Sequence, residues 1–120
     1  MKKRKSTDER FAAKLLFQYR VLVDGKANIM RTCEERLVVF RTGTARSALA
    51  IAKRRGKAAQ FRQTNHAGNP VYFEFVGVLD LLHLGAECLE DEMWYDIKVI
   101  KQPKERAKKI LPAEKKLNAI

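Results

Sequence analysis

The chain has 120 residues, of which 46% are hydrophobic, and this size and composition fit one globular domain with a single core. No apolar run approaches the roughly 18 residues that a membrane-spanning helix needs, and no long apolar segment follows the basic start of the chain as it would in a signal peptide. The sequence therefore predicts a cytoplasmic protein. Its two cysteines, Cys33 and Cys88, lie far apart and form neither a disulfide framework nor a metal-binding Cys-x-x-Cys pair.

The net charge of +11 lies mainly at the two ends of the chain. Residues 1–10 carry five basic residues against two acids, residues 101–120 carry seven against two, and residues 11–100 carry thirteen against ten. We therefore divide the chain into a basic leader at 1–10, a single domain at 11–101 and a basic C-terminal helix or tail at 102–120. Because a basic end attracts any polyanion, the charge alone does not identify a partner.

Two strands are predicted in the first third of the chain. Residues 11–23 alternate strongly apolar side chains with mixed ones, which indicates a strand with one apolar face. The turn-forming residues 24–26 follow, and residues 27–32 are expected to be a loop or a lead-in to the next strand. Residues 33–41 predict a second strand, antiparallel to the first.

A helix is predicted directly after the second strand. The stretch Thr42-Gly43-Thr44 ends the strand and offers an N-cap, and Gly56 is expected at the end of the helix or in its last turn. Small apolar residues follow the cap at helical spacing: Ala45, Ala48, Leu49 and Ala52. Such a narrow stripe lets a helix approach a sheet closely.

A hairpin is predicted before the most apolar part of the chain. Residues 59–64 are a candidate strand, and the turn cluster 65–70 leads into residues 71–84. The first half of this stretch is rich in β-branched and aromatic side chains with little alternation, which predicts the central strand of the sheet, covered on both faces. Asp80 is expected to cap a turn at residues 81–84.

The last strand is predicted at residues 93–101, after a connection with four acidic residues between positions 87 and 92. Pro103 suits the first turn of a short helix at 104–110, and residues 113–120 are expected to be a frayed tail or a second short helix. The elements follow the order β-β-α-β-β-β with a short C-terminal helix. This order predicts an α+β fold, in which one main helix packs on a largely antiparallel sheet of about five strands.

Three short motifs occur in order along the chain: Leu15-Leu16-Phe17, Cys33-Glu34-Glu35 and Phe73-Glu74-Phe75-Val76-Gly77-Val78-Leu79-Asp80-Leu81. With these motifs the chain resembles a family of small bacterial proteins with a domain of unknown function. The resemblance covers roughly residues 11–100. The family carries no established activity or catalytic residues, so the resemblance implies no chemistry. Small bacterial families of this kind often act as binding or immunity partners, and the resemblance implies a role of that kind.

The candidate polar site consists of four carboxylates: Glu34, Glu35, Glu74 and Asp80. If the strands pair as predicted, Glu35 and Glu74 lie on faces that also carry apolar residues. Two carboxylates on one such face would be an acid–base pair or a site for a hard cation. The alternative, which we favour, is that they are structural and either accept backbone hydrogen bonds or bind basic side chains: Arg20, Arg36, Arg41 or Lys98.

No catalytic or metal-binding set stands out among the other polar residues. His66 lies in a turn and His83 lies among leucines, and the two show no spacing typical of metal ligands. We find no Ser-His-Asp arrangement and no glycine-rich phosphate loop after a strand. The sequence therefore predicts a protein that is not an enzyme and that needs no cofactor.

A candidate basic surface lies on the predicted helix and just after it: Arg46, Lys53, Arg54, Arg55, Lys57 and Arg62. Together with the basic ends it would bind the phosphates of a nucleic acid, whereas the alternative is a solvated helix surface.

The leading functional hypothesis is a small cytoplasmic protein-binding module that is not an enzyme, with an immunity protein against a toxin domain as one candidate role. It follows from the single domain, the lack of a catalytic set and the family resemblance. The alternative is a nucleic-acid-binding protein without sequence preference, which would use the basic surface and the basic ends. The sequence leaves the identity of the partner and the oligomeric state open, and it predicts no membrane association.

Overall fold

The computed structural model describes residues 8–85, 93–117 and 119, with the backbone alone at residues 93–97. These residues form an α+β fold, as the sequence predicts. The bounds of the elements are β1 Glu9–Val23, β2 Lys26–Ala27, β3 Met30–Thr42, α1 Ala45–Ala58, β4 Phe61–Thr64, β5 Pro70–Gly85, β6 Met93–Lys101, α2 Ala107–Ile110 and the 3-10 turn η1 Glu114–Lys116. Most of the basic leader, Cys88 and the acidic connection before β6 lie outside the described residues.

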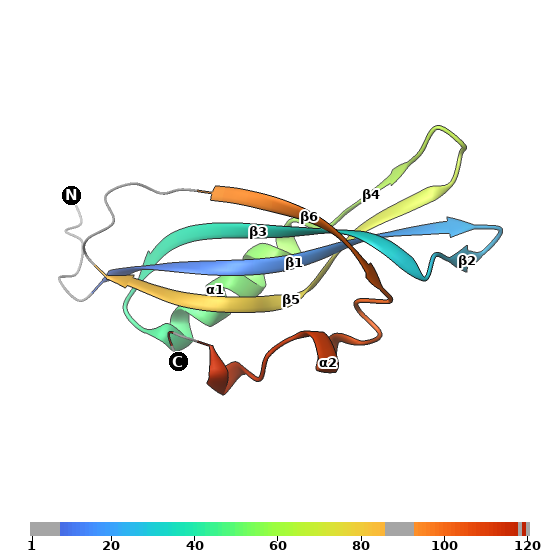
Figure 1. Cartoon of the computed structure of the whole chain (residues 1–120). Coiled ribbons are helices and arrows are strands. Elements are labelled where there is room, and N and C mark those ends of the chain that lie inside the picture. The colour runs from blue at the N-terminus through green and yellow to red at the C-terminus, as the bar shows by residue number, and fades with distance from the viewer. Residues whose placement is uncertain (1–7, 86–92, 118, 120) are drawn as a thin grey trace, which may run out of the picture.

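The strands form one antiparallel sheet in the order β4-β5-β1-β3-β6, and β2 pairs with the end of β1. β1 is therefore the central strand (Figure 1). The expectation that residues 71–84 are central is wrong, because they belong to β5, which pairs with β4 only from Pro70 to Phe73. The apolar composition of β5 has another cause: α1 packs on one of its faces, and Leu111 lies against the other face at Gly77.

Three β-bulges in β5 explain why its sequence shows no regular alternation. One extra residue of β5 stands opposite β1 at Val76, at Leu79 and at Leu84. The core side chains of β5 are consequently spaced by two or three residues instead of strictly by two: Phe73, Phe75, Val78 and Leu81. Each bulge restores the match between the apolar face of β5 and that of β1.

β5 also continues where a turn was expected. Residues 81–84 remain in the strand because β1 is long enough to pair with them, with Phe11 opposite His83. Asp80 therefore caps no turn, and its Oδ1 accepts the N–H of Leu81 at 2.8 Å.

Residues 27–32 were expected to form a loop or a lead-in to the next strand. In the structure the loop is shorter, because Ala27 belongs to β2 and β3 already begins at Met30. Asp24 and Gly25 both have positive φ angles, 52° and 76°, and form the two-residue turn that joins β1 to β2. This turn chemistry suits a tight hairpin, because its twist matches that of the flanking strands.

α1 begins as the sequence predicts, at Thr44, whose Oγ1 accepts the N–H of Ser47 at 3.0 Å. The helix continues past Gly56, and a side chain at this position would overlap the ring of Phe75. Its buried residues are small apart from one leucine: Ala48, Leu49, Ala52 and Gly56. The close approach of α1 to the sheet encloses an aromatic core, in which the rings of Phe17 and Phe73 stack with centroids 4.7 Å apart.

No helix of the described residues is long and apolar enough to cross a membrane.

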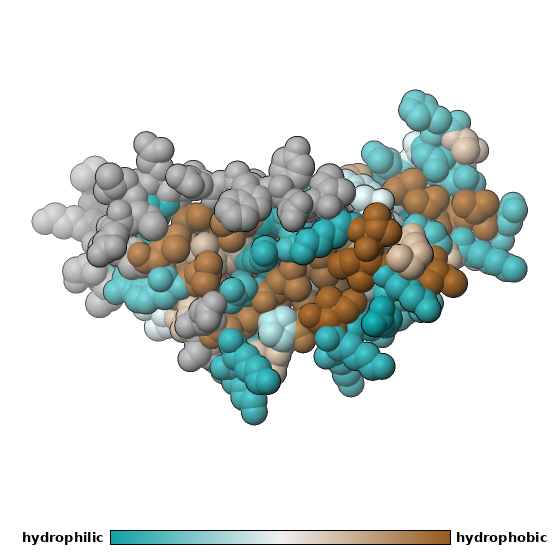
Figure 2. Space-filling model, viewed as in Figure 1, coloured by the Kyte–Doolittle hydropathy of each residue, from teal (hydrophilic) through white to brown (hydrophobic). Residues whose placement is uncertain are grey.

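Residues 102–117 and 119, here called the C-terminal segment, fold back beside the sheet (Figure 1). α2 is shorter than the helix expected at 104–110, and η1 stands where a frayed tail or a longer helix was expected. Leu117 lies in the core with 3% of its surface exposed, and the N–H of Ala119 donates to the carbonyl oxygen of Leu81 at 2.8 Å. On the face opposite α1, hydrophilic side chains follow this segment below a band of hydrophobic side chains over the strands (Figure 2).

Candidate functional site

The four carboxylates of the candidate polar site do not converge on one point. Glu34 and Glu35 are neighbours in β3, so their side chains point to opposite faces of the sheet. Glu34 forms an ion pair with Arg36, whose guanidinium group lies 4.8 Å from the centroid of the Phe17 ring, on the face that carries α1. Glu34 therefore helps to hold an arginine over the edge of the core.

Glu35 is buried on the face opposite α1 and binds two lysines. Lys98 Nζ lies 2.5 Å and Lys14 Nζ lies 3.1 Å from its carboxylate oxygens. Burial raises the pKa of Glu35, but the hydrogen bonds from Lys98 and Lys14 outweigh burial and leave the pKa below its ordinary value. A carboxylate held ionised in this way suits a structural ion pair and not proton donation.

Glu74 lies in β5 and binds Arg20 of β1. Arg20 donates from Nε and Nη2 at 2.8 and 3.1 Å, and Gln18 donates from Nε2 at 2.8 Å. The hydrogen bond from Arg20 lowers the pKa of Glu74 against the effect of burial.

Asp80 lies farther along β5, opposite Lys14 of β1. Among the residues that the structure describes, no group of three histidine, cysteine or acidic side chains could hold a metal ion.

A buried arginine that the sequence analysis missed attaches the C-terminal segment to the sheet. Arg31 is 2% exposed and donates to both carboxylate oxygens of Glu105, at 2.8 and 3.0 Å. It also donates to Gln18 Oε1 at 3.1 Å, and that oxygen accepts the N–H of Lys104 at 3.3 Å. No local pattern predicts the contact between Arg31 and Glu105, because it joins residues 74 positions apart.

The candidate basic surface divides into residues with intramolecular contacts and residues that face solvent. Arg46 and Lys53 bind Glu114 of the C-terminal segment, at 3.9 and 2.8 Å. Two other arginines lie over aromatic rings: Arg55 over Phe40 and Arg62 over Tyr72. Arg54 and Lys57 are exposed on α1. Four of the six residues are therefore engaged by groups of the chain itself.

α1 covers only part of its side of the sheet. Its 14 residues extend about 21 Å, whereas the 15 residues of β1 extend about 50 Å. The strands run on well past the C-terminal end of α1 (Figure 1). One end of this sheet face therefore lacks a covering element within the described part of the chain.

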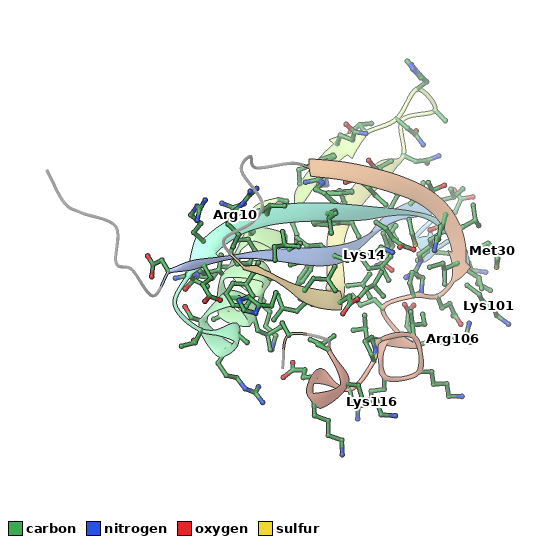
Figure 3. All side chains as sticks on the ribbon, turned by 60° about the vertical axis from the view of Figure 1, so that its left-hand side comes forward. Arg10, Lys14, Met30, Lys101, Arg106 and Lys116 are labelled. Atoms are coloured by element: carbon green, nitrogen blue, oxygen red, sulfur yellow. The ribbon has the colours of Figure 1, made fainter. Side chains whose placement is uncertain are left out.

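The uncovered end is here called the open face and comprises Tyr19, Val21, Val23, Met30, Thr32 and Val99. In β1 these residues continue the alternation of Phe17, whose side chain packs in the core. In β3 and β6, Met30 stands opposite Lys101 and Thr32 stands opposite Val99. Val99 is 62% exposed and Met30 is 55% exposed, and Figure 3 labels Met30 and Lys101 at this end of the sheet. The open face thus presents large apolar side chains to solvent.

Basic side chains border the open face. Lys101 stands opposite Met30 in the pairing of β6 with β3, and the guanidinium group of Arg36 lies over the ring of Phe17, which precedes Tyr19 on this face of β1. A cavity of about 310 Å³ lies beneath the C-terminal end of α1, and Arg55 and Arg36 line it together with apolar residues: Leu15, Phe17, Val38, Ala58 and Ala59. Burial, followed by the negative charge of Glu34, raises the pKa of the Tyr19 hydroxyl, so that this hydroxyl stays neutral.

A groove of about 560 Å³ follows the outer edge of β5, between α1 and the C-terminal segment. Its base is formed by residues 75–78 of β5. Side chains of α1 and of Gln60 form one wall, and the C-terminal segment forms the other: Lys53, Lys57 and Gln60 on the first side, and Lys104, Leu111, Pro112 and Glu114 on the second. Gly77 permits this arrangement, since a side chain at position 77 would overlap Leu111.

The comparisons with known proteins identify the family. A family model described as "Domain of unknown function (DUF4288)" matches residues 10–93, which run from β1 to the first residue of β6. No curated protein and no solved structure matches the chain. The matched region covers more than half of the 120 residues. It includes all of α1 and β5, and all of β1 except its first residue, Glu9. The chain therefore belongs to the DUF4288 family of domains of unknown function.

Proposed function

We propose that the protein is a binding module without enzymatic activity and that a partner protein docks on the open face. The observation that supports this proposal is the exposure of Met30 and Val99 on a sheet face that no described element covers. A sheet with an apolar face normally buries that face against another layer of structure. Apolar side chains gathered on an uncovered surface mark an interaction site more often than isolated exposed residues do.

The charge of the protein indicates the chemistry of the partner. The chain carries a net charge of +11, and Lys101 stands at the border of the open face, opposite Met30. An apolar patch with an acidic border would complement this surface, and opposite charges would also speed association. A second copy of the same chain would bring the same positive charge, which opposes self-association.

An immunity protein against a toxin domain is one form that this function would take. Such a protein needs a contact surface and no catalytic residues, which agrees with the carboxylates being held in ion pairs. A toxin gene beside the gene for this protein would identify the first partner to purify and to test for binding.

A site-specific cross-link tests the proposal in the full-length chain. A photo-reactive amino acid replaces Val99, and a matched control places it at Arg54 on the exposed side of α1. We expect one acidic protein to be captured from position 99 and not from position 54. The purified partner should then bind the chain, and Met30→Asp should weaken binding by about tenfold or more while the melting temperature stays unchanged.

Two outcomes would contradict the proposal. Cross-links from position 99 only to a second copy of the chain would show self-association instead. Binding of duplex DNA that falls steeply with salt, and that Met30→Asp does not change, would favour the nucleic-acid alternative. Neutralising Arg54 and Lys57 would then weaken that binding, because these residues face solvent on α1.

A further inference from the structure

The outer edge of β5 is open between two capped positions. At one end, the N–H of Phe75 donates to Gln60 Oε1 at 3.0 Å, and at the other end the carbonyl oxygen of Leu81 accepts the N–H of Ala119. β4 reaches only to Phe73, so no described strand pairs with this side of β5 between the two caps. An edge of this kind offers hydrogen-bonding groups to an added strand.

The open edge has the length of a short strand. Phe75 and Leu81 lie six positions apart, which corresponds to about 20 Å in an extended chain. The groove of about 560 Å³ follows residues 75–78, the first half of this edge. The ion pair between Lys53 and Glu114 joins the two walls of the groove, so an added acidic segment would compete with Glu114 for Lys53.

The two walls of the groove differ in chemistry. Lys53 and Lys57 stand on the α1 side, whereas Leu111 and Pro112 stand on the side of the C-terminal segment. Lys104 and Glu114 also line the second wall, and Glu114 binds Lys53 and Arg46 of α1.

We propose that this groove binds an extended, acidic segment of a partner protein as an added strand beside β5. Successive side chains of a strand point to opposite faces. Acidic side chains at every second position would therefore meet Lys53 and Lys57, and apolar side chains at the positions between them would meet Leu111 and Pro112. Main-chain hydrogen bonds would supply affinity. Selectivity would come from the two walls, which the alternate side chains of the added strand would meet in turn.

This site goes beyond the proposed function, because it lies at a different edge of the sheet from the open face. A segment that binds in the groove does not need the partner that docks on the open face. Met30→Asp should therefore leave binding in the groove unchanged, and a substitution in the groove should leave the open face unchanged. Failure of one proposal is thus distinguishable from failure of the other.

The test uses the full-length chain and a fluorescein-labelled peptide of about six residues in which glutamate and valine alternate. Fluorescence anisotropy should show saturable binding. Lys57→Glu reverses a charge in the groove, whereas Arg54→Glu makes the same change on α1 outside the groove. We expect Lys57→Glu to weaken binding by about tenfold and Arg54→Glu by no more than about threefold, with unchanged melting temperatures.

A second peptide tests strand addition separately from charge. It has the same charge but carries proline in place of the central valine, which removes an N–H and prevents regular pairing. We expect this peptide to bind about tenfold more weakly than the parent peptide. Equal affinity for the two peptides would overturn strand addition, and equal effects of Lys57→Glu and Arg54→Glu would reduce the site to general attraction of anions. The absence of saturable peptide binding, or equally tight binding of a single-stranded oligonucleotide in the groove, would also overturn the proposal.

Discussion

Replacing Leu117 by alanine tests whether the C-terminal segment is an integral part of the domain. Leu117 is 3% exposed and packs in the core shared by α1 and β5. Truncation of a buried leucine costs about 2–5 kcal/mol, and we expect about 2–3 kcal/mol here because Leu117 lies outside any helix or strand, so its backbone can adjust to part of the cavity. For a domain of 120 residues, this loss corresponds to a fall in melting temperature of roughly 8–12 °C.

Urea unfolding followed by circular dichroism measures the effect, with Lys116→Ala as the matched control. Lys116 is exposed and precedes Leu117, so its substitution should change the free energy of unfolding by less than about 0.5 kcal/mol. Equal stabilities of the two variants would refute the conclusion that the C-terminal segment contributes to the core. The slope of the urea transition should be the same in both variants, since the surface exposed on unfolding is similar.

Two further predictions concern the contact of α1 with the sheet and the response to acid. Gly56→Ala should destabilise the protein by about 1–3 kcal/mol in urea unfolding, because the new methyl group would overlap the ring of Phe75; a gain in stability would contradict the close contact. The hydrogen bond from Arg20, opposed by burial, holds the pKa of Glu74 below its ordinary value of 4.5, so the stability it contributes is complete above pH 4.5 and is lost as the pH falls through the folded-state pKa. Glu74→Gln should therefore lower the urea midpoint at neutral pH more than in acid, and an equal difference at both pH values would argue against this ion pair.

Local sequence signals were sufficient for α1 and for the pairing of β1 with β3. Thr44 caps α1 through a hydrogen bond to a residue three positions away, and the small residues that approach the sheet recur at helical spacing. The alternation at residues 11–23 also indicated the apolar face of β1 correctly. These features depend on neighbours in sequence, and that is why a single sequence predicts them.

The two candidate surfaces depend on contacts between distant residues. The groove exists because Arg31 binds Glu105 and because Leu117 enters the core, and neither contact leaves a periodic pattern. The open face has a different explanation, since its cause is a difference in length between α1 and β1. Both lengths can be estimated from the sequence, so the uncovered end of the sheet could have been predicted by comparing them.

The bulges of β5 have a consequence for how the length of this strand can vary. At Val76 and Leu79 the strand contains one residue more than β1 requires, so deletion of one such residue would restore regular pairing and leave the faces on either side unchanged. Deletion at Phe73, where pairing with both neighbours is regular, would instead turn every following side chain to the opposite face. The bulges are therefore the positions at which this strand tolerates a change of length without a change of fold.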